Sequence, residues 1–208
     1  GYPMMKQESA VSPVIGILLM LVVTIIIAAV VSSFAGGFAS GSSKAPQARL
    51  AVSPSISNIQ DEDTTNWVSD YPDGFTADNG ILFEHQGGDS FSLTDVNVQI
   101  QSQDTKIMLN LTSEMPSSNC ATSTYYIKKV GAGDAGTYGL SNEQTMINPG
   151  DQFMVVADNC RIDPFGPQIS FKPQGSYGGF GAYTNTNIGY QVIDRKSGKT
   201  IQEGSFIL

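Results

Sequence analysis

The sequence predicts an α+β protein in which one long apolar N-terminal helix is followed by an all-β domain. The apolar run from Val14 to Val31 is interrupted only by Gly16 and Thr24, and no charged residue lies between Glu8 and Lys44. Beyond residue 50, short apolar runs alternate with turn residues, which is typical of strands. The chain has 208 residues and 40% apolar composition, enough for one packed domain with an appendage.

The apolar segment is long enough to cross a bilayer. From Pro13 to Phe38 a helix would measure roughly 38 Å, which exceeds a hydrocarbon core of ~30 Å. Apolar residues occupy every side, unlike the single apolar stripe of a soluble surface helix. We expect Pro13 in the first helical turn and Ser12 as the N-cap.

Three interpretations of this helix compete: a cleaved secretory signal, an ordinary membrane anchor, and a helix that begins in the membrane and ends inside a filament. A signal peptide usually has a shorter apolar core. A dry helix bundle needs small residues for close approach and branched aliphatics that interdigitate, and both are present. The residues expected to form the assembly contact are Pro13, Val14, Ile15, Gly16, Leu19, Val23, Ile26, Val30 and Phe34.

A short motif at the start of the helix is specific. The run Ser9-Ala10-Val11-Ser12-Pro13-Val14-Ile15-Gly16 resembles the signature that opens the hydrophobic helix of archaeal type IV pilins. The resemblance implies a membrane-inserted precursor that a prepilin peptidase processes near a basic residue, for which Lys6-Gln7 is a plausible site. It also implies that the pilus assembly machinery packs identical subunits into an extracellular cell-surface filament.

Composition divides the chain into four expected segments: an N-terminal segment (1–12), the hydrophobic helix (13–38), a Gly/Ser-rich linker (39–49) and an outward β domain (50–208). The last segment holds 18 Asp and Glu residues against 8 Lys and Arg residues. An acidic surface argues against nucleic acid as the primary partner, because phosphate binding needs a basic face.

The outward domain predicts an immunoglobulin-like sandwich of about seven to nine strands. Two stretches resemble the head domains of the same pilin group: Ile81 to Asp89, and the turn Asn148-Pro-Gly-Asp151. The expected strands are Ile81–His85, Leu93–Ile100, Lys106–Leu111, Tyr125–Val130, Phe153–Ala157, Gln168–Lys172, Tyr190–Ile193 and Thr200–Leu208.

Two covalent modifications are expected on this domain. Cys120 and Cys160 are the only cysteines, and an even pair in a β domain outside the cytoplasm is most simply a disulfide. Asn110-Leu111-Thr112 is the only N-x-[ST] sequence, so Asn110 is the expected glycosylation site, with an unmodified asparagine as the alternative.

Other candidate residues have a structural and a functional interpretation. For His85, the only histidine, a turn residue bonded to nearby backbone is favoured over a catalytic base or ligand. The carboxylates Asp61-Glu62-Asp63, Asp70, Asp73 and Asp78 lack a Ca²⁺-loop spacing and are expected to form a solvated loop. The aromatics between Gly175 and Tyr183 either contact other surfaces or cover one end of the sandwich, and the sequence does not separate the two.

The expected function is therefore a structural filament subunit that serves surface adhesion or cell contact. We expect no enzymatic activity, metal or cofactor, because the sequence has no phosphate-binding, nucleophile-elbow or C-x-x-C motif. The alternatives are a subunit of an archaellum-type motility filament, a membrane-anchored β-domain binding protein that does not polymerise, and an anchored hydrolase. The last would need an acid–base pair that the sequence does not reveal.

Overall fold

The computed structural model describes residues 2–41, 44–56, 79–118, 120–132, 140–160, 168–176 and 178–208. Of residues 2–11 and 34–41 it describes the helical backbone alone. The chain divides into two compact units, Gly1–Ser43 and Lys44–Leu208. We call the second unit the head. The expected acidic loop from Asp61 to Asp78 and the aromatic Tyr177 lie outside the described residues.

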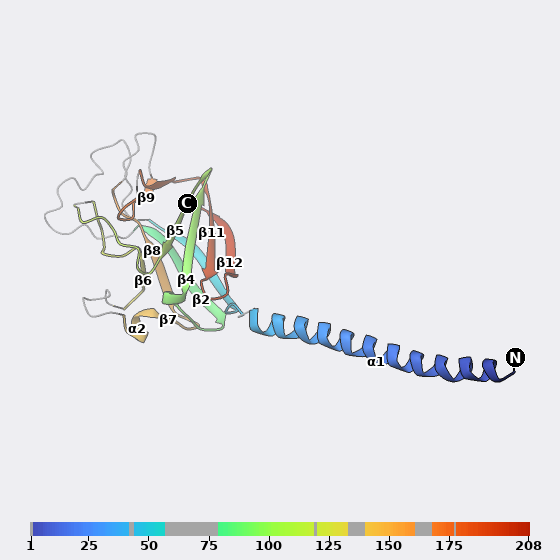
Figure 1. Cartoon of the computed structure of the whole chain (residues 1–208). Helices are drawn as coiled ribbons and strands as arrows, with labels where there is room; N and C mark the ends of the chain where they lie inside the picture. The colour runs from blue at the N-terminus through green and yellow to red at the C-terminus, as the bar shows by residue number, and fades with distance from the viewer. Residues whose placement is uncertain are drawn as a thin grey trace. The chain divides into compact units, whose positions relative to one another are not determined.

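The first unit is one continuous helix, α1 (Tyr2–Gly41), which is longer at both ends than the expected 13–38 (Figure 1). The prediction that Ser12 caps the helix and Pro13 opens it is wrong, because Pro13 lies in the helix interior. Residues 4–8 are mostly strong helix formers, so the helix begins earlier. Pro13 has no N–H, so the carbonyl of Ser9 loses its usual donor within the helix.

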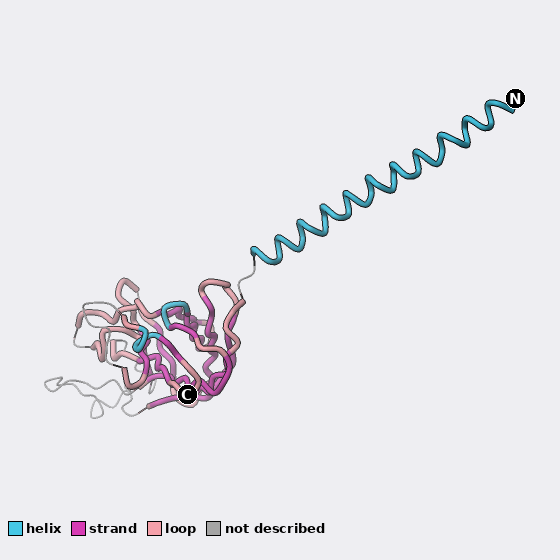
Figure 2. Tube along the Cα trace, turned by 90° about the horizontal axis from the view of Figure 1, so that it is seen from below, coloured by secondary structure: helices cyan, strands magenta, loops and turns pink. Residues whose placement is uncertain are grey.

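The head contains two four-stranded antiparallel sheets, whose strands Figure 2 shows gathered in this unit. The first sheet has the order β1-β2-β8-β6, with bounds Ala48–Ser55, Gly80–Gly88, Gln152–Val156 and Ile127–Lys129. The second has the order β12-β11-β4-β5, with bounds Thr200–Ile207, Asn187–Asp194, Val96–Ser102 and Thr105–Asn110. The predicted α+β fold, an N-terminal helix followed by a mostly β domain, is thus confirmed, while the immunoglobulin-like assignment stays a prediction.

Four smaller elements accompany the two sheets in the described part of the head: two strand pairs and two short helical turns. Two short strand pairs are β9 (Gln168–Phe171) with β10 (Phe180–Tyr183), and β3 (Phe91–Ser92) with β7 (Met146–Ile147). A 3-10 turn η2 (Leu93–Asp95) precedes β4, and a single helical turn α2 (Asn142–Thr145) precedes β7. The sequence predicted β9 but neither β10 nor α2, since both follow segments rich in Gly and polar residues.

One hydrophobic core joins the two sheets. Side chains along β4 alternate as the sequence predicts, with Val96, Val98 and Ile100 buried between half-exposed Asn97 and Gln99. Phe83 of β2 stacks on Phe153 of β8 with 4.7 Å between ring centroids, and meets the ring of Tyr190 of β11 edge-on at 5.7 Å. The aromatic contact between β2 and β11 therefore spans the two sheets.

The aromatic-rich stretch from Gly175 to Tyr183 contributes to this core in its described part. Phe180 is 3% exposed and packs against Phe171, with 6.1 Å between ring centroids. Phe180 is therefore a core residue of the head and does not offer its ring to other surfaces.

The outer strands of the two sheets, β1 and β12, meet along an edge that one side chain bridges. Gln202 Oε1 accepts a hydrogen bond from the Leu50 N–H at 2.7 Å, and Gln202 Nε2 donates to the Leu50 carbonyl at 2.6 Å. A primary amide offers the same donor and acceptor as a peptide group, so Gln202 replaces one rung of a strand ladder. Gln202 Nε2 also donates to the Tyr190 hydroxyl at 2.8 Å, which ties this edge to the core.

Replacing Gln202 by Leu is expected to destabilise the head by about 1–3 kcal/mol, because the Leu50 N–H and carbonyl lose their partners in a half-buried position. The measurement is denaturant unfolding of the full-length chain in detergent. Ser205→Ala on the same strand removes an exposed hydroxyl and serves as the control. Equal unfolding free energies for the two variants would contradict the bridging role of Gln202.

Candidate assembly helix and its junction with the head

The apolar surface of α1 is uncovered on every side within a single chain. Every residue from Ser12 to Ser33 is exposed, and this stretch of 22 residues has a mean hydropathy of 3.3. Even the least exposed large side chains among them, including Ile15 and Val30, are 51% exposed. Contact between this apolar surface and water is unfavourable, so lipid or other apolar helices are expected to surround it.

Five of the nine expected contact residues share one face of this helix. Gly16, Leu19, Val23, Ile26 and Val30 follow one another at spacings of three and four, which places them along a single stripe. Pro13 to Ile15 precede this stripe, and the side chain of Phe34 lies outside the described residues.

Thr24 is the one polar residue within the apolar run, and its hydroxyl is satisfied inside the helix. Thr24 Oγ1 donates to the Met20 carbonyl at 2.7 Å. The helix therefore presents no unpaired hydroxyl to an apolar environment at this position.

The head begins earlier than the expected linker of residues 39–49 allows. Helix α1 continues to Gly41, and Ala45 is already only 5% exposed. The Gln47 N–H donates to Asp89 Oδ2 at 2.9 Å, and the Asp89 N–H donates to the Gln47 carbonyl at 2.7 Å. The segment before β1 is thus clamped to the turn after β2, and only residues 42 and 43 separate the described parts of helix and head.

The turn that holds Gln47 depends on Gly88. Its φ is +100°, and a Cβ at this position would lie 2.1 Å from the Gln47 carbonyl oxygen. Both facts require glycine here, the first through backbone strain and the second through the close approach of the two chains.

His85 organises the same turn from inside the head. It is 1% exposed, with Nε2 at 2.7 Å from the Asp89 carbonyl and the Gly87 N–H at 3.2 Å from Nδ1. These partners assign the donor role to Nε2 and the acceptor role to Nδ1. The interpretation as a turn histidine bonded to nearby backbone agrees with this geometry.

The strand and turn from Ile81 to Asp89 lie beside the turn from Asn148 to Asp151. The Gly150 N–H donates to the His85 carbonyl at 2.8 Å, and the His85 N–H donates to the Asp151 carbonyl at 2.9 Å. The Asn148 N–H donates to Asp151 Oδ2 at 2.9 Å and Lys129 Nζ lies 3.4 Å from it. The backbone hydrogen bond, aided by Lys129, lowers the pKa of the Asp151 carboxyl.

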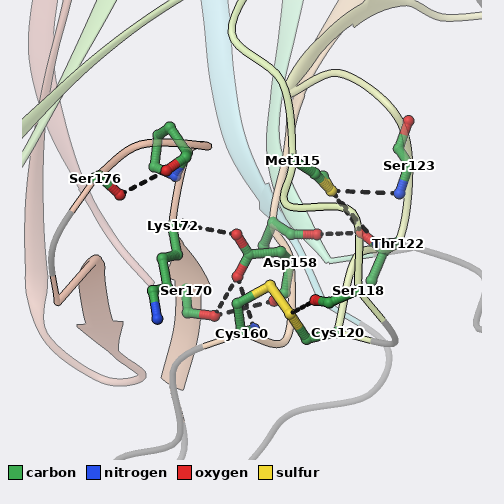
Figure 3. The surroundings of a disulfide bond; sticks show 12 residues. Met115, Ser118, Cys120, Thr122, Ser123, Asp158, Cys160, Ser170, Lys172 and Ser176 are labelled. Atoms are coloured by element: carbon green, nitrogen blue, oxygen red, sulfur yellow. Dashed lines mark hydrogen bonds between the residues drawn. A yellow bond between two sulfur atoms is a disulfide. The ribbon is translucent and has the colours of Figure 1, made fainter.

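Cys120 and Cys160 form the expected disulfide, with 4.7 Å between their Cα atoms (Figure 3). The two residues are 40 positions apart in the sequence. In the chain-entropy account, closing a loop of this size stabilises the fold by about 4 kcal/mol.

A buried carboxylate beside the disulfide was not predicted from the sequence. Asp158 is 2% exposed, and its carboxylate accepts hydrogen bonds from several segments around the disulfide (Figure 3). Its Oδ1 accepts from the Ser170 hydroxyl at 2.7 Å and the Cys160 N–H at 2.9 Å. Its Oδ2 accepts from the Lys172 N–H at 2.6 Å and from the Tyr126 hydroxyl. These four hydrogen-bond donors offset the cost of burying the Asp158 carboxylate. The sequence around Asp158 contains no motif that predicts them.

Asn110 lies at the end of β5 in a local turn that its own sequon forms. Asn110 Oδ1 accepts from the Thr112 N–H at 2.9 Å and from the Thr112 hydroxyl at 2.6 Å. Asn110 pairs in register with Asn97, whose Oδ1 is buried without a hydrogen-bond partner. The part of the chain that the structure describes holds no group of three His, Cys, Asp or Glu side chains that could bind a metal ion.

Comparison with known families identifies the N-terminal part of the chain. Residues 9–50 match the family model described as archaeal type IV pilin, N-terminal. The match covers most of α1 and the junction, and it ends at Leu50, the residue that Gln202 holds. No curated protein matches the chain.

The hydrogen bond from Tyr126 to Asp158 predicts sensitivity to alkaline pH. Burial, with the nearby Asp158 charge, raises the pKa of Tyr126 above its ordinary value of 10.0. Stability is therefore fully present below about pH 10 and falls above it, because the unfolded chain loses this proton first.

Tyr126→Phe is expected to lower the unfolding free energy at neutral pH by about 1–3 kcal/mol and to reduce its fall above pH 10. The measurement is denaturant unfolding across that pH range, with Tyr190→Phe as the control for loss of a hydroxyl. An unchanged alkaline slope in Tyr126→Phe would contradict the assignment.

Proposed function

We propose that the chain polymerises through α1 into an archaeal type IV pilus-like extracellular filament, and the match of residues 9–50 to the archaeal type IV pilin N-terminal model supports this. Pilins are structural subunits, so the proposed activity is assembly rather than catalysis. A prepilin peptidase acting near Lys6-Gln7 and the pilus assembly machinery are the proposed partners before polymerisation.

The observation that carries this proposal is the exposed apolar surface from Ser12 to Ser33. In the membrane, lipid covers this surface at little cost, because lipid and helix are equally apolar. In a filament surrounded by water, only the helices of identical subunits can cover it. The stripe of Gly16, Leu19, Val23, Ile26 and Val30 supplies the small and branched side chains for such packing.

The head is proposed to form the outer sheath and to serve adhesion or cell contact. It has its own core and disulfide, and the Gln47–Asp89 clamp fixes where the chain enters it. A motility filament of the archaellum type and an anchored β domain that stays monomeric are the competing functions. The run from Ser12 to Gly16 favours a pilus over an archaellum, whose subunits usually open without it.

Asn110 is proposed to carry an N-linked glycan on this sheath. The Asn110 side chain is half-buried at a strand end, and its Nδ2 has no hydrogen bond to any residue that the structure describes. The nitrogen that a glycan would modify is thus not committed to the fold.

Val23→Asp is expected to abolish filaments while the head stays folded, because an unpaired carboxylate would enter a dry helix bundle. The measurement is filament yield by electron microscopy, together with the amount of subunit in the membrane fraction.

Val23→Ile is the matched control, since it keeps an aliphatic side chain on the same stripe. Wild-type filament yield in Val23→Asp would contradict the role of this stripe. Loss of the aspartate variant from the membrane fraction would instead assign the defect to insertion.

Asn110→Gln is expected to remove a glycan mass from the peptide that contains residue 110, because the acceptor asparagine is lost. Mass spectrometry of subunits isolated from filaments makes this measurement. An unmodified peptide in the wild type would contradict glycosylation at Asn110.

A further inference from the structure

The second sheet carries a polar hollow on its solvent-facing side. The hollow has a volume of about 400 Å³ and lies across β4, β11 and β12. We call it the sheet groove. Its lining residues are Gln99, Gln101, Gly189, Tyr190, Gln191, Glu203, Gly204 and Ser205.

Strand register shows which side chains form its walls. Gly189 pairs with Gln101 on one side and Ser205 on the other, and Gln191 pairs with Gln99 and Glu203 in the next row. These residues alternate with buried Ile188 and Val192, so their side chains point away from the core. By the same alternation Tyr190 and Gly204 face the core side, and their contribution to the wall is main chain.

Gly189 forms the floor of the groove, and the fold does not require a glycine there. A Cβ at position 189 would meet nothing closer than Gln101 Cβ at 3.7 Å, an ordinary contact, and its φ is not in the left-handed region. A glycine inside a strand weakens it and commonly marks close approach of a ligand or another chain. The missing side chain therefore leaves space between the two rows of polar walls.

Several polar groups around this space are not used by the fold. Within the described residues, the side chains of Gln99, Glu203 and Ser205 make no hydrogen bond or ion pair. Gln191 Nε2 donates to Thr200 Oγ1 at 2.6 Å, which leaves its carbonyl oxygen as an acceptor. The groove thus presents amide donors, amide acceptors, a hydroxyl and one carboxylate within two adjacent rows.

From this geometry we propose that the sheet groove binds uncharged sugar units of an oligosaccharide presented by another surface. Sugar hydroxyls donate and accept at once, which matches amides and a carboxylate that have no partner in the protein. Met108, 46% exposed and in register with Gln99, offers an apolar ledge for the C–H face of a sugar.

Other occupants fit these walls less well. Glu203 in the wall disfavours phosphate or another anion, and the lining has no aliphatic side chain for a lipid tail. A protein partner would be expected to bury an apolar centre, which this groove lacks. The inference rests on the proposed outward position of the head, since a groove facing the filament axis could not meet another surface.

The test uses the full-length subunit in detergent and immobilised oligosaccharides of glucose, mannose, galactose and N-acetylglucosamine, with heparin as an anionic counterpart. The wild type is expected to bind at least one uncharged probe. Gly189→Thr fills the groove floor and should weaken that binding at least about tenfold, with a melting temperature no lower than the wild type. Gln99→Ala should also weaken binding, since it removes an amide that the fold does not use.

Asn187→Thr is the matched control, because it introduces the same residue on the same strand outside the groove and should leave binding unchanged. Three results would overturn the proposal: no uncharged probe binds, binding survives Gly189→Thr, or heparin is preferred. Binding that appears only in Asn110→Gln would overturn it too, by making the subunit's own glycan the occupant. Binding is measured on separate subunits in detergent, so it does not depend on filament formation. If filaments form but no sugar binds, the groove proposal is wrong and the filament proposal stands. If sugar binds but no filaments form, the filament proposal is wrong and the groove proposal stands.

Discussion

One constraint dominates this protein: the apolar surface of α1 is exposed in the single chain and must be covered by something else. Burying the aliphatic side chains between Val14 and Val31 is favourable by an amount on the order of tens of kcal/mol relative to water, taken as an upper bound. Transfer from lipid into a helix bundle changes this free energy little, whereas release from a bundle into water would lose all of it. A filament held by this helix would therefore assemble from the membrane and resist dissolution outside it.

The head is a separate compact unit, and its stability comes from contacts within it. Its two sheets share one core, the disulfide closes a long loop, and Gln202 completes the edge between β1 and β12. The hydrogen bonds between Gln47 and Asp89 hold the first residues of the head in place shortly after α1 ends at Gly41. The matched pilin segment ends at Leu50, so it stops where the chain joins the sheets.

The sequence predicts the elements whose signals are local. The charge-free run predicts α1, the alternation from Val96 to Ile100 predicts β4, and the single cysteine pair predicts the disulfide. The predicted helix ends were wrong because α1 continues through Pro13 despite its missing N–H, with strong helix formers on its N-terminal side, and runs on past Gly36 and Gly37.

Features that depend on residues far apart in the sequence could not be predicted. The partner of Gln202 lies 152 positions away, and Asp158 is held by donors from three separate segments. The groove over Gly189 was missed for the same reason. Its glutamines lie on two strands about 90 residues apart, and only their register brings them together.

Electron microscopy of material sheared from the cell surface, with mass spectrometry of its protein, tests the central claim most directly. The account predicts thin filaments composed mainly of this chain, with an N-terminus that reveals the processing site. Recovery of the chain only from the membrane fraction, as a detergent-soluble monomer, would contradict assembly through α1 and leave an anchored β domain.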